Sequence, residues 1–221
     1  MPSLLRPLPV KLAIFFLSLA IACNALGWIE LTSEILLQVK AKYGDRAERR
    51  LIEWQNLLRS AKNLPEKDKL DKVNDFFNLN SLFVDDIIHW KVEDYWATPL
   101  EFLATGAGDC EDFAIAKYFT LKELGVDENK MRITYVKALR LNQAHMVLTY
   151  FKTPKAVPEV LDNLIPDIKP ATQRTDLLPV YSFNGTGLWI AKSRNAGKQV
   201  GNSDRLSLWN DLKLRMLKNP F

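Results

Sequence analysis

The chain has 221 residues, of which 48% are hydrophobic and 25% are charged, and its formal net charge at pH 7 is +4. Basic and acidic residues are interspersed as they are on a solvated surface, so neither the composition nor the charge pattern indicates a nucleic-acid partner. Beyond the first 25 residues the sequence has no apolar run of the roughly 20 residues that a membrane-spanning helix needs, which excludes such a helix there.

Residues 1–25 are predicted to be a signal peptide. Arg6 and Lys11 form a cationic start, and residues 12–21 form an apolar run about half as long as a membrane span. Small residues then follow at the spacing that a signal peptidase recognises, so we expect cleavage at the end of this segment. A retained N-terminal anchor and a lipid-modified Cys23 are the alternatives.

Removal of this leader leaves residues 26–221, which we expect to form one soluble domain. A chain of about 196 residues is long enough to bury a substantial core. Without Arg6 and Lys11 there are 28 basic residues against 26 acidic ones, a net charge of about +2. The exported protein is therefore expected to be almost neutral.

The first half of this domain is predicted to be helical. Four consecutive segments carry apolar residues at helical spacing, and Gly44 and Pro65 mark the ends of two of them. The four predicted helices cover residues 31–44, 45–65, 66–80 and 81–96. Their polar faces are rich in Lys, Glu and Asp, which we interpret as solvated surface.

A glycine-rich turn precedes the next predicted helix. Thr98 and Pro99 begin a short helical turn, and the segment TGAG that follows places two glycines in three residues. The backbone can therefore bend sharply there and approach another group closely. Asp109 is in position to cap a helix that starts at Cys110 and ends near Leu124, and the mixture of small and large apolar residues in it is typical of a buried central helix.

The hydrophobic period changes to two after this helix, which is typical of strands. Strands are predicted at residues 131–140, 144–151 and 157–164, and a hairpin at residues 179–192. A C-terminal helix is predicted over residues 203–219. The order of helices, a central helix and then an antiparallel sheet, without alternating strands and helices, indicates an α+β fold.

Cys110 is expected to be the only cysteine of the exported protein, because Cys23 lies in or beside the leader. An unpaired thiol in an oxidising compartment is at risk of oxidation, so it is either buried and inert or kept for chemistry. The N-terminus of a helix favours a thiolate, and its free N–H groups can stabilise an oxyanion. Cys110 is therefore a candidate nucleophile.

Only two histidines could serve as the base. His145 begins a predicted strand, and Asp162 lies on the next one, which should pair with it antiparallel. Asp162 could then fix the tautomer of His145 while the other ring nitrogen faces Cys110. His89 has no such context and is interpreted as structural. The alternative is that Cys110 fills space, His145 ends a strand and Asp162 caps a turn.

Three carboxylates surround the cysteine in the segment DCED. The charges of Asp109, Glu111 and Asp112 should raise the pKa of the thiol and oppose the thiolate. Helix capping and interaction with the helix dipole would explain two of these carboxylates more easily than all three. Clustered oxygen ligands suit Ca²⁺, whose charge would offset theirs. We therefore hypothesise a bound Ca²⁺ beside the cysteine.

From about Trp28 onward the chain resembles the bacterial transglutaminase-like cysteine proteinases. The segments that carry the resemblance occur in the order of that family and are GDCEDFAIAKYFTLKELGV, RITYVKA, AHMVL, VLDN and YSFN with GLW. The resemblance implies a papain-like, transglutaminase-like fold. It also implies that Cys110 is the nucleophile, His145 the general base and acid, and Asp162 the carboxylate that orients the histidine.

The family resemblance also implies a calcium site and a function. Calcium would be bound by Asp109, Glu111 and Asp112, together with backbone carbonyls, waters or distant residues that the sequence does not identify. The implied protein is a periplasmic, calcium-dependent cysteine endopeptidase. Its substrate would be the N-terminal region of a large surface adhesin, cut next to paired alanines, so that the adhesin leaves the outer membrane and the biofilm disperses.

The same resemblance implies a regulatory partner. An inner-membrane receptor that senses cyclic di-GMP in the cytoplasm would sequester the protease on its periplasmic side. Without this receptor, we expect the protease to be monomeric.

Two other functions are compatible with the sequence. A transglutaminase or amidase could use the same Cys110, His145 and Asp162, with an amine accepting the acyl group in place of water in the transglutaminase case. A catalytically silent module could bind Ca²⁺ or a receptor without turnover. The presence of all three candidate catalytic residues argues against the silent module.

Overall fold

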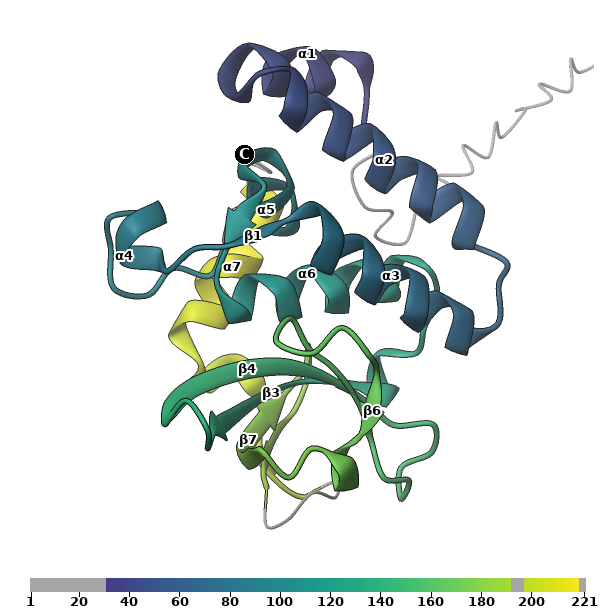
Figure 1. The fold of residues 1–221 in the computed structure, drawn as a ribbon, viewed down its shortest axis with the longest axis vertical. Coiled ribbons are helices and arrows are strands. Elements are labelled where there is room, and N and C mark those ends of the chain that lie inside the picture. The colour runs from purple at the N-terminus through teal and green to yellow at the C-terminus, as the bar shows by residue number, and fades with distance from the viewer. Residues whose placement is uncertain (1–30, 192–196, 219–221) are drawn as a thin grey trace, which may run out of the picture.

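The computed structural model describes residues 31–191 and 197–218, so the predicted signal peptide and its cleavage site lie outside the described residues. None of the helices in these two ranges is both long and apolar enough to cross a membrane. The described chain has a helical layer on one side, a sheet on the other, and a central helix between them (Figure 1).

The N-terminal layer consists of α1 (Ser33–Tyr43), α2 (Asp45–Ala61) and α3 (Glu66–Asn80). These helices confirm the first three predicted helices. Their apolar positions face the core, and Trp54 on α2 donates its indole N–H to Thr120 Oγ1 on the central helix at 2.9 Å. The helical layer therefore lies directly against the helix that carries Cys110.

The prediction of a fourth helix over residues 81–96 is wrong. Only α4 (Asp86–His89) is helical there; β1 (Leu82–Phe83) precedes it. The buried Asp86 carboxylate accepts a hydrogen bond from the N–H of Tyr95, and Lys91 has a positive φ of 64°. The short helix is thus followed by a left-handed residue, and the Asp86 carboxylate holds the chain where it folds back nine residues later.

The turn before the central helix is built as the two glycines predict. The short helix α5 (Pro99–Thr105) ends at Gly106, which is left-handed with φ 71°, and β2 (Ala107–Gly108) then pairs in parallel with β1. A Cβ atom at Gly108 would lie 2.2 Å from Asp112 Oδ2. A glycine is therefore required there, because the backbone passes directly against the Asp112 carboxylate.

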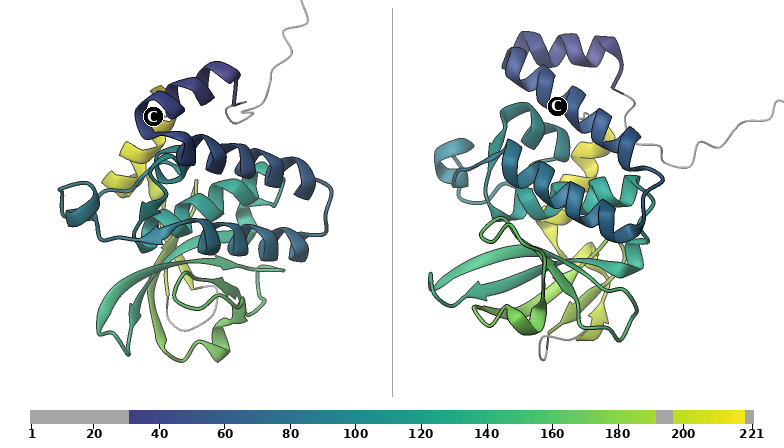
Figure 2. Two further views of the ribbon diagram at one scale, coloured as in Figure 1. Left: turned by 45° about the horizontal axis from the view of Figure 1, so that its top comes forward. Right: turned by 45° about the vertical axis from the view of Figure 1, so that its right-hand side comes forward.

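The central helix α6 (Cys110–Glu123) confirms the predicted buried helix. All ten of its residues from Asp112 to Leu121 are buried. It contacts α3 and α5 on one side and β3 and β4 on the other (Figure 2). Cys110, at the N-terminus of α6, lines the same cleft as residues 143–146 at the start of β4, so α6 places Cys110 beside that strand.

Within the described residues, seven strands form one antiparallel sheet in the order β6-β5-β4-β3-β7-β8-β9. The predicted strands and hairpin are present, although the predicted strand at 157–164 is regular over only three residues. The strands are β3 (Met131–Ala138), β4 (Gln143–Tyr150), β5 (Glu159–Leu161), β6 (Lys169–Pro170), β7 (Leu177–Phe183), β8 (Leu188–Ile190) and β9 (Lys198–Gly201). Short 3₁₀ turns lie at η1 (Glu128–Lys130), η2 (Ala171–Gln173) and η3 (Ser203–Arg205).

The chain returns to the helical side in α7 (Ser207–Lys218), close to the predicted C-terminal helix. Trp209 of α7 packs among aromatic rings of α6 and β7, 5.4 Å from Phe119 and 5.2 Å from Phe183 between ring centroids. This packing joins the C-terminal helix, the central helix and the sheet in one hydrophobic core. The α+β fold class predicted from the sequence is confirmed.

Candidate active site

The pairing of β4 with β5 brings His145 and Asp162 together. Leu148 lies opposite Leu161, so Asp162, the residue after β5, comes next to Val147, two residues from His145. His145 Nε2 is 2.8 Å from Asp162 Oδ1, and both side chains are buried. Because Nε2 of His145 is hydrogen-bonded to Asp162, Nδ1 is the ring nitrogen that can face another group.

Cys110 and His145 line the same cleft, which has a volume of about 470 Å³. The half-buried Cys110 enters this cleft from the first residue of α6, and Trp96 and Tyr135 form part of its walls. Met146, the residue after His145, also lines this cleft. The structure therefore brings all three predicted catalytic residues to one place, on α6, on β4 and at the end of β5.

Arg174 is a second partner of Asp162 that the sequence did not reveal. Its guanidinium Nη2 donates to Asp162 Oδ2 at 2.7 Å, and the N–H of Leu164 donates to Oδ1 at 3.1 Å. Burial alone would raise the pKa of Asp162, but the hydrogen bond with His145, the Leu164 N–H and the charge of Arg174 lower it to about 2. Asp162 is thus held ionised and fixed in orientation.

This lowered pKa predicts how stability depends on pH. The stabilisation by ionised Asp162 is complete above its ordinary pKa of 3.8 and is lost as pH falls toward about 2. We expect wild type to be roughly 2 kcal/mol more stable than Asp162→Asn at pH 6, with most of the difference lost at pH 2. The measurement is chemical denaturation of both proteins in EGTA between pH 2 and 6.

An exposed carboxylate provides the control for that experiment. Asp167 is mostly exposed, and its ion pair with Lys169 is long, at 3.9 Å, so it contributes little to stability. The stability of Asp167→Asn should therefore follow that of wild type over the whole pH range. A stability difference between wild type and Asp162→Asn that stays constant from pH 6 to pH 2 would contradict the lowered pKa.

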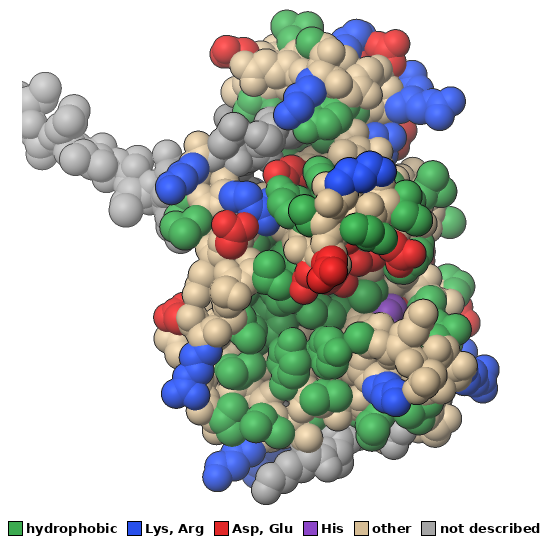
Figure 3. Space-filling model, turned by 90° about the vertical axis from the view of Figure 1, so that its left-hand side faces the viewer, with side chains coloured by type: hydrophobic (Ala, Val, Ile, Leu, Met, Phe, Trp, Pro, Cys, Tyr) green, Lys and Arg blue, Asp and Glu red, His purple; other side chains and the backbone are tan. Residues whose placement is uncertain are grey.

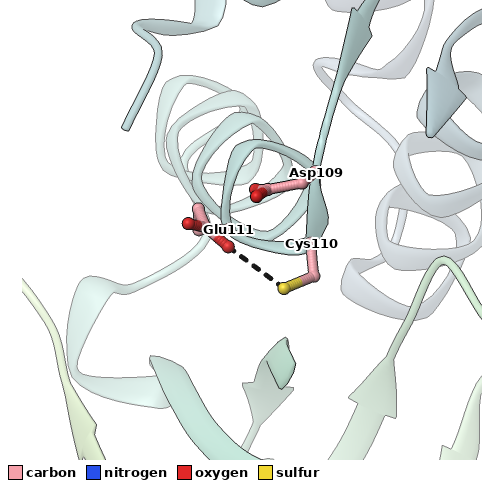
Figure 4. Close-up of side chains that lie close together, drawn as sticks. All are labelled: Asp109, Cys110 and Glu111. Atoms are coloured by element: carbon pink, nitrogen blue, oxygen red, sulfur yellow. Dashed lines mark hydrogen bonds between the residues drawn. The ribbon is translucent and has the colours of Figure 1, made fainter. Parts of the chain in front are cut away.

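Acidic side chains gather around the cysteine. Glu111 Oε2 accepts a hydrogen bond from the Cys110 thiol at 3.0 Å, and the Asp109 carboxylate lies beside it at the first turn of α6 (Figure 4). On the face that carries α4, acidic side chains form a cluster next to an apolar area (Figure 3). Asp109 occupies the N-cap position as predicted, but its side chain makes no capping hydrogen bond.

Burial is the main cause that raises the pKa of the cysteine and of three carboxylates around it. Burial, followed by contact with Glu111, raises the pKa of Asp109 to about 9, and burial raises that of Glu111 to about 7. Burial and the charge of Asp109 raise the pKa of Asp112 well above its ordinary value. Burial, with the charges of Glu111 and Asp109, likewise raises the pKa of the Cys110 thiol. Burial and these carboxylates therefore oppose a thiolate.

Buried carboxylate oxygens without partners fit a bound cation. Asp112 uses Oδ1 to accept the N–H of Ala97 at 2.7 Å, while its buried Oδ2 has no hydrogen-bond partner within the described residues. Asp109 Oδ1 and Asp86 Oδ1 are buried without a partner in the same part of the chain. Oxygens of Asp86, Asp109 and Asp112 lie within 4.8 Å of one another. Such a set suits a hard cation such as Ca²⁺.

The structure thus adds two residues to the predicted metal ligands. Asp86 comes from α4, and the exposed Asp94 lies near both Asp86 and Glu111. The sequence placed both in a predicted helix, and nothing in their spacing distinguished them from surface acids. The predicted ligands Asp109, Glu111 and Asp112 do lie together, and their role in metal binding stays a prediction.

A cysteine at the start of a central helix, facing a histidine and a carboxylate on an antiparallel sheet, is typical of the papain-like and transglutaminase-like thiol enzymes. Residues 51–191 match the family described as bacterial transglutaminase-like cysteine proteinase BTLCP. The chain belongs to this family and is a cysteine protease. No curated protein matches the chain at a significant level.

Solved structures of Legionella pneumophila LapG are similar to most of this chain. The EGTA-treated form is 45% identical and covers 86% of this chain and 99% of its own, with a TM-score of 0.74. A second LapG structure is 44% identical with the same coverage and a TM-score of 0.73. The calcium-bound form is 45% identical and covers 83% of this chain and 98% of its own, with a TM-score of 0.71. These values confirm the resemblance to a LapG-like protease.

Proposed function

We propose that this protein is a periplasmic, calcium-dependent cysteine endopeptidase that cuts the N-terminal region of a large surface adhesin. The observation that carries the proposal is the contact of buried Asp162 with His145, which lines the cleft that Cys110 enters. Membership of the proteinase family supports peptide hydrolysis, and the predicted signal peptide supports export.

The proposed reaction is acyl transfer through a thioester. His145 takes the proton of the Cys110 thiol, and the sulfur attacks the peptide carbonyl carbon. N–H groups at the start of α6 can stabilise the resulting oxyanion. His145 then donates its proton to the leaving amine as the C–N bond breaks. Water, deprotonated by His145, attacks the thioester and releases the carboxylic acid and the thiol.

Calcium is proposed to occupy the carboxylate cluster. Asp86, Asp109 and Asp112 would hold it, with Glu111 and Asp94 close by. When bound, the ion supplies positive charge that offsets these carboxylates near the thiolate. The unpartnered buried oxygens described above support this proposal, as does the existence of a calcium-bound LapG structure.

The substrate and the regulation are proposed from the resemblance to the family. We propose cleavage next to paired alanines, which would release the adhesin from the outer membrane and promote biofilm dispersal. We also propose that an inner-membrane receptor sensing cyclic di-GMP binds the protease on the periplasmic side, and that the free protease is a monomer.

The direct test is cleavage of the adhesin N-terminal region by the purified protease. Wild type in Ca²⁺ should cut the fragment once, whereas Cys110→Ala should leave it intact, because only the thiolate can form the acyl-enzyme. Mass spectrometry with and without an added amine separates hydrolysis from transglutamination. Equal cutting by both proteins, or amine conjugates as the main product, would overturn the proposal.

A further inference from the structure

A lysine is buried inside the central helix. The Lys117 side chain is 1% exposed, and its Nζ donates to Asn74 Oδ1 at 2.9 Å and to the main-chain oxygen of Asp162 at 3.2 Å. In the described ranges, no carboxylate side chain forms an ion pair with it. Burial of a charged amine is costly, and hydrogen bonds to these two oxygens offset part of that cost.

Side chains of α3 complete this hydrogen-bond network. Asn78 Nδ2 donates to the main-chain oxygen of Asp162 at 2.8 Å, so that oxygen receives two donors from two different helices. Asn74 Nδ2 donates to the main-chain oxygen of Pro166 at 2.7 Å. The irregular segment that follows β5 is therefore tied to the helical layer at two main-chain positions.

We propose that Lys117 and Asn78 are positioning residues for catalysis: they hold the main chain of Asp162 so that its carboxylate meets His145 at a fixed place relative to Cys110. The inference rests on the proposed roles of these three residues. Cys110 and Lys117 lie on one face of α6, two turns or roughly 10 Å apart. One rigid helix thus carries the nucleophile at its start and the amine that fixes the orienting carboxylate.

The network does not depend on one protonation state. Burial lowers the pKa of Lys117 to about 7, while the charges of Asp162 and Asp75 oppose this shift. Both the ammonium and the neutral amine carry N–H donors, so either form can hold the Asp162 carbonyl. Arg174 fixes the carboxylate itself from the other side, at Oδ2.

The test compares three variants in Ca²⁺. Lys117→Met and Asn78→Ala each remove one donor to the Asp162 oxygen, and Thr120→Val removes a different buried hydrogen bond of α6, the one to Trp54. For the first two we expect kcat to fall roughly 10- to 100-fold with little change in KM, because a misplaced carboxylate affects chemistry more than binding. Thr120→Val should lower the melting temperature but retain kcat.

A second readout needs no substrate. The rate of Cys110 alkylation at pH 7 should fall in Lys117→Met and Asn78→Ala toward the rate in His145→Ala. Unchanged alkylation and kcat in both variants, with only a lower melting temperature as in Thr120→Val, would overturn the proposal. If Lys117→Met does not fold, Asn78→Ala carries the test, because Asn78 is half-buried. If the adhesin is not cut by wild type, the proposed substrate fails while alkylation still tests the positioning role.

Discussion

Replacing His145 with alanine is expected to lower kcat/KM for peptide cleavage at least roughly a thousandfold. The imidazole is the only proposed base for the thiol, and its Nε2 is already committed to Asp162 at 2.8 Å. Without it, the raised pKa of Cys110 leaves almost no thiolate at neutral pH. Steady-state cleavage of the adhesin fragment measures the loss.

The other histidine of the chain provides a matched control. His89 lies at the end of α4, where its ring packs edge-on against Trp90 with 4.6 Å between centroids. His89→Gln should retain activity close to wild type. Comparable losses in His89→Gln and His145→Ala would contradict the assignment of His145 as base.

Chelating calcium with EGTA is expected to remove both activity and a large part of the thermal stability. Without a cation, the buried carboxylates of Asp86, Asp109 and Asp112 are left close together with unpartnered oxygens. A ligand present at a hundred times its Kd stabilises the folded state by about 2.7 kcal/mol, so added Ca²⁺ should raise the melting temperature by several degrees. Calorimetry and cleavage assays in Ca²⁺ and in EGTA measure the two effects.

A conservative variant of the same site tests the contribution of metal binding separately. Asp112→Asn keeps the shape of the side chain and the acceptor for the Ala97 N–H but removes a charge from the cluster. Its melting temperature should no longer respond to Ca²⁺, whereas Asp204→Asn, at an exposed carboxylate on η3, should respond as wild type does. Full activity of wild type in EGTA would contradict the calcium requirement.

The sequence predicted most helices because their apolar periodicity reflects burial. In α2, Leu51 and Trp54 are buried at helical spacing, and in α7 the same is true of Trp209 and Leu212. The segment 81–96 has a similar apolar pattern, but there the pattern does not reflect burial. Its apolar residues are largely exposed (Leu82, Phe83, Ile87 and Ile88), so they do not report the packing of a helix.

The parts of the candidate site that the sequence revealed are those encoded locally. Asp109 and Glu111 are next to the cysteine in the sequence. The contact between His145 and Asp162 was predictable because the two residues belong to consecutive strands that pair antiparallel. Asp86 and Arg174 reach the site only through tertiary folding. Asp86 arrives through a chain reversal, and Arg174 through the connection after β6. Neither has a spacing that distinguishes it from a surface charge.

The central claim is that Cys110 becomes a thiolate because a histidine and a bound cation together outweigh the carboxylates around it. The rate of Cys110 alkylation as a function of pH, in Ca²⁺ and in EGTA, for wild type and His145→Ala, tests this claim most directly. We predict a low apparent thiol pKa for wild type in Ca²⁺ and a raised one in EGTA or in His145→Ala. Slow alkylation with the same ordinary pH dependence in all four samples would contradict the claim.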